Sequence, residues 1–117
     1  MSQIYVALDL ETTGLDAKSD AIIEIGCVKL HEGEIVDQWS TLVSPGRKLA
    51  FVITQLTGIA DRDLIGQPSI REVIEPLRRF VGSLPIVAHN ASFDLGFVAA
   101  AGLNFANPIL DTFEIAS

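Results

Sequence analysis

Cysteine is nearly missing from this sequence, since Cys27 is the single one among 117 residues. One cysteine excludes an internal disulfide and a zinc site built from several cysteines, and it fits a reducing, cytoplasmic setting. No apolar run approaches the roughly 20 residues that a membrane-spanning helix needs. The first residues, Met-Ser-Gln, lack the basic start and apolar stretch of a signal peptide. The sequence therefore predicts a cytoplasmic protein without a membrane partner.

Basic residues are also scarce. Eight lysines and arginines stand against fifteen acidic residues, which gives a formal net charge of −7. Proteins that grip long nucleic acids by their phosphates are usually basic, so this balance argues against a broad duplex-binding groove. It leaves room for a metal-dependent enzyme that holds only a strand end, because bound cations invert the local charge. The length and the 49% hydrophobic content predict one folded domain.

The stretch Ile4–Leu15 organises the rest of the chain. It begins as a short apolar run of strand-forming residues and then places Asp9 and Glu11 two positions apart. Side chains of a strand alternate between faces, so both carboxylates project from the same face. Two such carboxylates repel each other, and a divalent cation such as Mg²⁺ would relieve the repulsion. Gly14 follows, where glycine lets the backbone approach a ligand closely or adopt a positive φ.

Two other interpretations of this pair stay open at this point. The first is a strand that simply runs into a solvated acidic turn. The second is a phosphatase of the haloacid-dehalogenase type, which places an Asp-x-Asp pair after a hydrophobic strand. Here the second carboxylate is Glu11, so that match is imperfect, and no later lysine and acidic pair complete it convincingly.

The remaining chain predicts alternating elements. Two further strands are expected at Ala21–Leu30 and Ile35–Val43, with Glu24 facing solvent in preference to the acidic site. We then expect a helical turn at Leu56–Ile59 and a helix at 70–81, which a Ser69–Glu72 capping box introduces. A strand at Pro85–His89, a helix at Phe93–Ala101, a strand at Pro108–Asp111 and the start of a helix at Thr112–Ser117 should follow. Leu49–Ile53 is left unassigned. This order predicts an α/β fold with a mixed sheet in which the first three strands are antiparallel.

Four segments in this order closely resemble the DEDD-type 3′–5′ exonucleases of the proofreading (DnaQ-like) group: Ala7–Leu15, Ile22–Gly26, Leu56–Ile59 and Ala88–Asp94. The resemblance covers nearly the whole chain. It implies an RNase H-like fold and hydrolysis of phosphodiester bonds by a two-metal mechanism with Mg²⁺ or Mn²⁺. Asp9, Glu11 and Asp94 match the family's first two motifs and would be the catalytic metal ligands.

The resemblance also implies how a nucleic-acid 3′ end is held. The residues expected to contact the terminal nucleotide are Thr12, Thr13, Gly14, Leu15, Leu56, Thr57 and Asn90. Ordinary core packing is the alternative role for Leu15 and Leu56. The partner would be a single-stranded 3′ end, DNA in preference to RNA, and none of these contacts reads a base edge.

The chain departs from the family pattern near its end. In the histidine subgroup, a general-base histidine and a fourth metal-binding aspartate follow a helix that starts near Asp111, and no residue here matches them. We therefore expect residues 1–117 to be an incomplete exonuclease domain that lacks its C-terminal helices and is weak or inactive alone. It would come from a helicase or polymerase fusion and could self-associate through the uncovered sheet. A non-catalytic nucleic-acid-binding or docking module is the alternative function.

Overall fold

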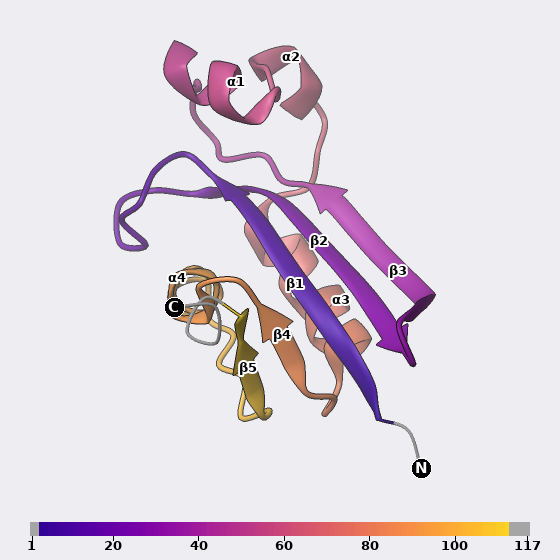
Figure 1. Cartoon of the computed structure of the whole chain (residues 1–117). Coiled ribbons are helices and arrows are strands. Elements are labelled where there is room, and N and C mark those ends of the chain that lie inside the picture. Colours follow the sequence, from indigo (N-terminus) through magenta and orange to yellow (C-terminus); the bar gives the residue numbers. More distant parts are fainter. Residues whose placement is uncertain (1–2, 113–117) are drawn as a thin grey trace.

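A computed structural model of the chain describes residues 3–112. A five-stranded sheet of order β3-β2-β1-β4-β5 forms its centre (Figure 1). The strands span β1 Ile4–Thr12, β2 Ile22–His31, β3 Glu34–Leu42, β4 Ile86–Ala88 and β5 Ile109–Asp111. The first three are antiparallel, whereas β4 pairs in parallel with β1 and β5 in parallel with β4. The predicted mixed α/β sheet is confirmed.

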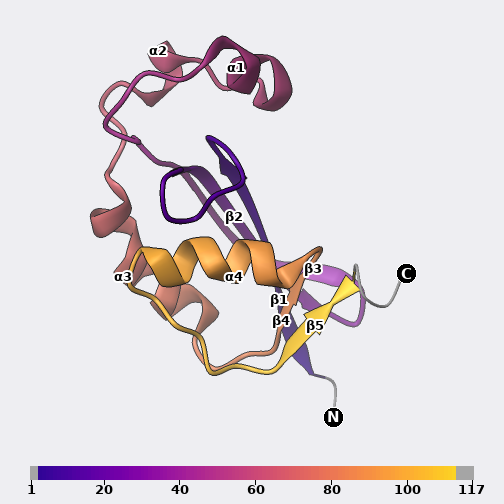
Figure 2. The same cartoon turned by 90° about the vertical axis from the view of Figure 1, so that its left-hand side faces the viewer.

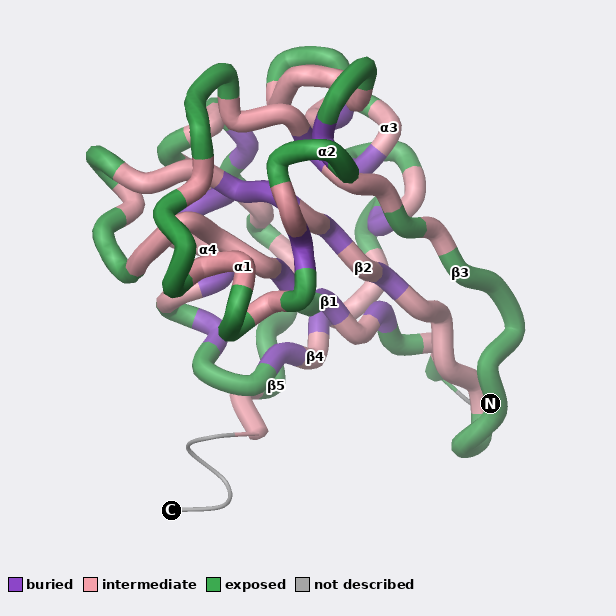
Figure 3. The backbone as a smooth tube through the Cα atoms, turned by 90° about the horizontal axis from the view of Figure 1, so that it is seen from above, coloured by how far each residue is buried: buried purple, intermediate pink, exposed green. Residues whose placement is uncertain are grey.

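The helices span α1 Phe51–Thr57, α2 Asp61–Leu64, α3 Ile70–Val81 and α4 Ala91–Ala100. Helices α3 and α4 contribute to one apolar core with the sheet (Figure 2). Side chains alternate between the two faces of β1, and the face toward these helices carries Val6, Leu8 and Leu10, which are all buried in this core. Burial is concentrated on the central strands, while β3 is largely exposed at the sheet edge (Figure 3).

Helix α3 begins as the sequence predicts. Glu72 accepts hydrogen bonds from the backbone N–H and the hydroxyl of Ser69, both at 3.1 Å, which is the carboxylate half of a capping box. The helix contains Pro76 and ends at Gly82, whose N–H donates to the carbonyl of Arg78.

Three sequence expectations need correction. The unassigned segment and the expected helical turn form one helix, α1, which Gly58 ends with a φ of 77°. Ala60–Pro68, which reads from the sequence as a linking segment, contains a second short helix, α2. Helix α4 begins at Ala91, ahead of the expected Phe93, because a distant side chain caps it, as described below. The helix expected over Thr112–Ser117 lies outside the described residues, apart from Thr112. Between residues 3 and 112, no helix has the length and apolar character needed to cross a membrane.

Candidate active site

Asp9 and Glu11 occupy the face of β1 opposite the buried Val6, Leu8 and Leu10, as the alternation predicts. Asp9 is exposed and stands across from Gly26 of β2, whose missing side chain leaves space beside it. An open cavity of about 420 Å³ lies there, lined in part by Asp9, Gly26 and Ser40. A group larger than water can therefore reach the Asp9 carboxylate from this side.

Glu24 stands directly across from Glu11 in the antiparallel register, so the two side chains share a face. The sequence favoured a solvent-facing position for Glu24, but the structure places it half-buried beside the acidic site. Burial, followed by the charges of Asp9 and Glu24, raises the pKa of Glu11. The exposed face of the sheet thus carries three carboxylates at one end.

Asp94 reaches the same region from helix α4. It lies in the first turn and is the one buried charged side chain in the part of the chain that the structure describes. Burial is the main cause that raises the pKa of Asp94 to about 7, and the charges of Asp9 and Asp111 add to it. Asp9 is the common neighbour that disfavours ionisation of both Glu11 and Asp94. The fold therefore places each of the other two predicted carboxylates, Glu11 and Asp94, within reach of the charge of Asp9.

This donor set fits a hard divalent cation. All three side chains offer carboxylate oxygens, which Mg²⁺ and Mn²⁺ prefer. A buried carboxylate beside like charges is costly, and a cation between them would remove that cost. Within residues 3–112, however, no three acidic, histidine or cysteine side chains already form a group that could hold a metal ion. The charges of these carboxylates act on one another, but in residues 3–112 their oxygens do not form a coordination shell.

The loop after β1 is held together by its own side chains. Thr12 donates to the carbonyl of Gly14 at 2.6 Å. The hydroxyl of Thr13 donates to Asp20 at 3.2 Å and accepts the N–H of Ala21 at 2.9 Å. A Cβ at Gly14 would lie 2.3 Å from a carboxylate oxygen of Asp20. A larger residue there would displace the Asp20 carboxylate from its hydrogen bonds with Thr13 and Asp16, which favours glycine, and Gly14 is not among the positive-φ glycines.

Leu15 and Leu56 are exposed, by 85% and 77%, so core packing does not explain either residue. They lie on the loop between β1 and β2 and on α1, which are both beyond the same end of the sheet (Figures 1 and 2). Thr57 differs, since its hydroxyl donates to the carbonyl of Ile53 and accepts the N–H of Ile59. Thr57 therefore supports the end of α1 with its hydroxyl.

Asn90 and Asp111 meet at the start of α4. Asn90 has a φ of 64°, and its side chain accepts a hydrogen bond from Ser92 at 3.3 Å. The Asp111 carboxylate accepts the N–H groups of Asn90 and Ala91, each at 3.0 Å. The neighbouring His89 is hydrogen-bonded to Thr112 through its ring Nδ1 at 3.2 Å, as expected of a structural histidine. Sequence patterns assign no role to Asp111, whose one signal is that an acidic residue ends an apolar strand.

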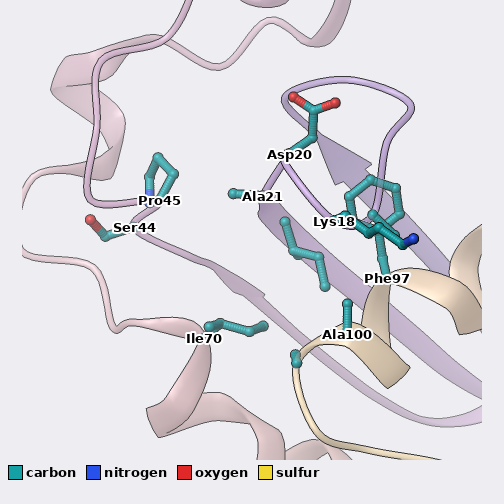
Figure 4. Close-up of a pocket in the computed structure, with 11 residues that line it drawn as sticks. Lys18, Asp20, Ala21, Ser44, Pro45, Ile70, Phe97 and Ala100 are labelled. Carbon is teal, nitrogen blue, oxygen red and sulfur yellow. The ribbon is translucent and has the colours of Figure 1, made fainter.

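A separate cavity of about 250 Å³ lies between the β1–β2 loop, the start of α3 and the end of α4 (Figure 4). Its lining includes Ile70 and Phe97 and none of the three carboxylates around Asp9. The Asp20 carboxylate points toward the β1–β2 loop, where it binds Thr13 and Asp16. This cavity is distinct from the acidic site.

Comparison with known proteins agrees with this geometry. The RNase T exonuclease family matches residues 6–116. The PolC-type DNA polymerase III of Clostridium perfringens is 47% identical over 116 residues, covering 96% of this chain and 8% of that protein. The corresponding protein of Bacillus subtilis is 42% identical over 119 residues, covering 97% of this chain and 8% of that protein. This chain thus spans a small part of the length of these relatives.

Solved structures extend the comparison. Exonuclease X in complex with 5′ overhanging duplex DNA aligns with a TM-score of 0.75 and 30% identity, over 96% of this chain and 61% of that one. Product-bound exonuclease I aligns with a TM-score of 0.79 over 99% of this chain and 31% of that one. Its identity is 12%, so this likeness concerns the RNase H-like fold alone. The family match over nearly the whole chain shows that it belongs to the RNase T family of DEDD exonucleases, hydrolases that act on phosphodiester bonds.

Proposed function

We propose that this chain is a 3′–5′ exonuclease domain that hydrolyses phosphodiester bonds at the 3′ end of single-stranded DNA. The observation that carries the proposal is the burial of Asp94, together with the charge of Asp9, which disfavours ionisation of both Asp94 and Glu11. A module that only binds nucleic acid has no need for such crowded carboxylates. The polymerase relatives and the DNA in the Exonuclease X structure favour DNA over RNA as substrate.

Asp9, Glu11 and Asp94 are the proposed catalytic residues and would hold two Mg²⁺ or Mn²⁺ ions. Bound in this way, such a pair supplies an activated water and stabilises the leaving oxygen. Carboxylates bind a cation only after losing their protons, so Asp94, with a pKa of about 7, must release its proton first. Asp9 is exposed beside the open cavity, so of these carboxylates it would be the most accessible to a cation and to a substrate phosphate.

The strand end would be held beside these carboxylates. The exposed apolar side chains of Leu15 and Leu56 offer surfaces for the terminal nucleotide. Thr12, Gly14 and Asn90 are the proposed polar contacts, and Asn90 would act through its side chain because Asp111 accepts its backbone N–H. Thr13 and Thr57 would shape this site from behind, because their hydroxyls are engaged within the protein. No such contact reads the edge of a base, so cleavage should be nearly independent of sequence.

We further propose that the 117 residues act as one incomplete exonuclease domain within a larger cytoplasmic protein. PolC-type polymerases carry the similar segment as 8% of their length, which favours a polymerase over a helicase as the parent. The chain alone should degrade DNA very slowly or not at all, because the similar segment is only 8% of the length of the proteins that carry it.

The test is release of mononucleotides from a 3′-labelled single strand with Mn²⁺ or Mg²⁺, with chelator added in parallel. It should be run on the chain alone and on a longer natural protein that carries it. In the longer protein we expect metal-dependent release, which Asp9→Ala, Glu11→Ala and Asp94→Ala should each reduce to background. Asp37→Ala is the matched control, since Asp37 is an exposed carboxylate of β3 with a local hydrogen bond to Gln38.

The outcome separates the enzyme from the docking module. If the longer, folded protein releases no nucleotide from DNA or RNA with either metal, the exonuclease proposal fails. Binding of a labelled strand without release would then favour the non-catalytic module.

A further inference from the structure

The start of helix α4 is an unusual junction because its cap comes from another strand. The first N–H groups of any helix lack partners within the helix, and a side chain at the N-cap commonly accepts one of them. Asn90 occupies the N-cap of α4 but makes no such bond with its side chain. Asp111 takes this role instead, with one oxygen accepting the N–H of Asn90 and the other that of Ala91.

The backbone around Asp111 fixes where this carboxylate lies. Asp111 ends β5 and pairs in register with Ala88, the last residue of β4, from which the chain runs into α4. The hydroxyl oxygen of the next residue, Thr112, lies 3.5 Å from the carbonyl oxygen of Ala88 and 3.2 Å from the ring Nδ1 of His89. Asp111 is therefore held on the sheet and acts on the helix that starts beside it.

Asp94 lies one turn beyond these two N–H groups. Because a helix moves as a stiff unit, a shift of its first turn moves Asp94 with it. Asp94 is buried and meets the charge of Asp9, so a small displacement changes the distance between two proposed metal ligands. Metal sites are sensitive to the groups that orient their ligands, whose loss typically costs about 10–100-fold in metal affinity.

The presence of aspartate at position 111 is informative in itself. Its carboxylate lies at the start of the helix that carries Asp94, and a second negative charge near a buried carboxylate is a cost. An asparagine would avoid this cost, but only its oxygen accepts hydrogen bonds, and its NH₂ group would put a donor opposite the second backbone N–H. Two acceptor oxygens in one plane match the two N–H groups of Asn90 and Ala91.

We propose that Asp111 is a positioning residue, whose carboxylate fixes the first turn of α4 and thereby sets the place of Asp94 relative to Asp9. The importance of this placement rests on the proposed exonuclease function. Asp111 acts through Asp94 and is not assigned contact with substrate or metal.

The test uses the 117-residue chain and compares Asp111→Asn with Asp61→Asn. Asp61 is a matched control because its carboxylate also accepts a distant backbone N–H, that of Leu49 at 2.8 Å, in the separate α1–α2 region. Three quantities are measured by NMR: amide hydrogen exchange at Asn90 and Ala91, the ¹³C shift of the Asp94 carboxyl, and broadening of amide signals on titration with Mn²⁺. Asp111→Glu, which keeps the charge but lengthens the side chain, replaces Asp111→Asn if that variant does not fold.

In the Asp111 variant we expect amide exchange at Asn90 and Ala91 to accelerate by about tenfold or more, and the Asp94 carboxyl signal to move. The Mn²⁺ dissociation constant should rise by about 10–100-fold. Asp61→Asn should change none of these three quantities. Both variants should lower the melting temperature, because each loses hydrogen bonds to a backbone N–H. If both variants lose stability alike while the Asp94 signal and the Mn²⁺ affinity stay as in the parent chain, Asp111 is an ordinary structural cap and the inference is overturned.

Failure of the proposed function gives a different result. If the parent chain binds no Mn²⁺, the metal site is refuted, and the position of Asp94 alone decides the inference. Because Asp111→Asn also removes a charge that acts on Asp94, the charge-conserving Asp111→Glu is decisive here. An Asp94 signal that moves in Asp111→Glu and not in Asp61→Asn then supports the positioning role, and an unmoved signal overturns it.

Discussion

The two faces of the central sheet are built from the same strands but do different things. On the α3 side, β1 buries Val6, Leu8 and Leu10 in the main core. On the other side the same strand carries Asp9 and Glu11 at one end and the exposed Tyr5 at the other. In Figure 1, α3 lies behind the sheet. The alternation of a strand thus separates stability from chemistry, and substitutions on the two faces should have separable effects.

The largest effect on folding should come from the covered face. Leu77 of α3 is fully buried, whereas Leu110 of β5 is 43% exposed on the other face. Leu77→Ala should lower the free energy of unfolding by about 2–5 kcal/mol, because a buried leucine loses its transfer energy and leaves a cavity. Leu110→Ala should cost less than about 1 kcal/mol, because much of its side chain is already in water. Urea denaturation measures both, and equal losses would contradict the division between the faces.

Binding of a divalent metal to Asp9 and Glu11, on the open face of the sheet, should raise the free energy of unfolding of the chain. A ligand that binds the folded state alone adds about 2.7 kcal/mol to stability at 100 times its dissociation constant. We expect Mn²⁺ to bind weakly and to raise the melting temperature of the parent chain, and chelator to reverse the rise. Asp9→Ala and Glu11→Ala should remove this response, while Asp37→Ala on the edge strand should keep it. An unchanged response in the first two variants would show that the metal site is elsewhere.

Without metal, the buried Asp94 should make stability depend on pH. Its pKa is raised from 3.8 to about 7, so the folded state binds more protons than the unfolded state between these values. Stability should therefore fall as pH rises from about 4 through about 7. In thermal melts with chelator, Asp94→Asn should lack this component, so its advantage over the parent chain should grow with pH. A constant difference between the two proteins across this window would contradict the raised pKa.

Local patterns predicted most of this fold. The period of two along β1 predicts that Asp9 and Glu11 share one face. The pair Ser69 and Glu72, three positions apart, predicts the start of α3 correctly. The start of α4 was wrong by two residues because its cap, Asp111, is 20 positions away and only the pairing of β5 with β4 brings it close. Contacts of this kind depend on tertiary structure, which single-sequence patterns do not contain.

The same limit applies to the candidate site. Asp94 was found through a motif, but its burial and its nearness to Asp9 follow from the packing of α4. Asp20 lies in a polar loop with no sequence signal of its own, although its carboxylate fills the space beside Gly14. Glu24 was expected in solvent because only the register with β1 reveals that it faces Glu11.

The smallest effect concerns the apolar end of the open face, where Tyr5, Leu30, Val87 and Leu110 line a shallow depression of about 390 Å³. Exposed apolar patches often mediate association, so we predict that this end pairs weakly with a second copy of the chain. Sedimentation velocity should show a concentration-dependent shift for the parent chain. Leu110→Lys should weaken it, since a charge at the centre of an apolar contact loses its hydration. The matched change Leu56→Lys, on the exposed helix α1, should leave association unchanged. A strictly monomeric chain at high concentration, or equal effects of the two substitutions, would contradict association through the apolar end of this face.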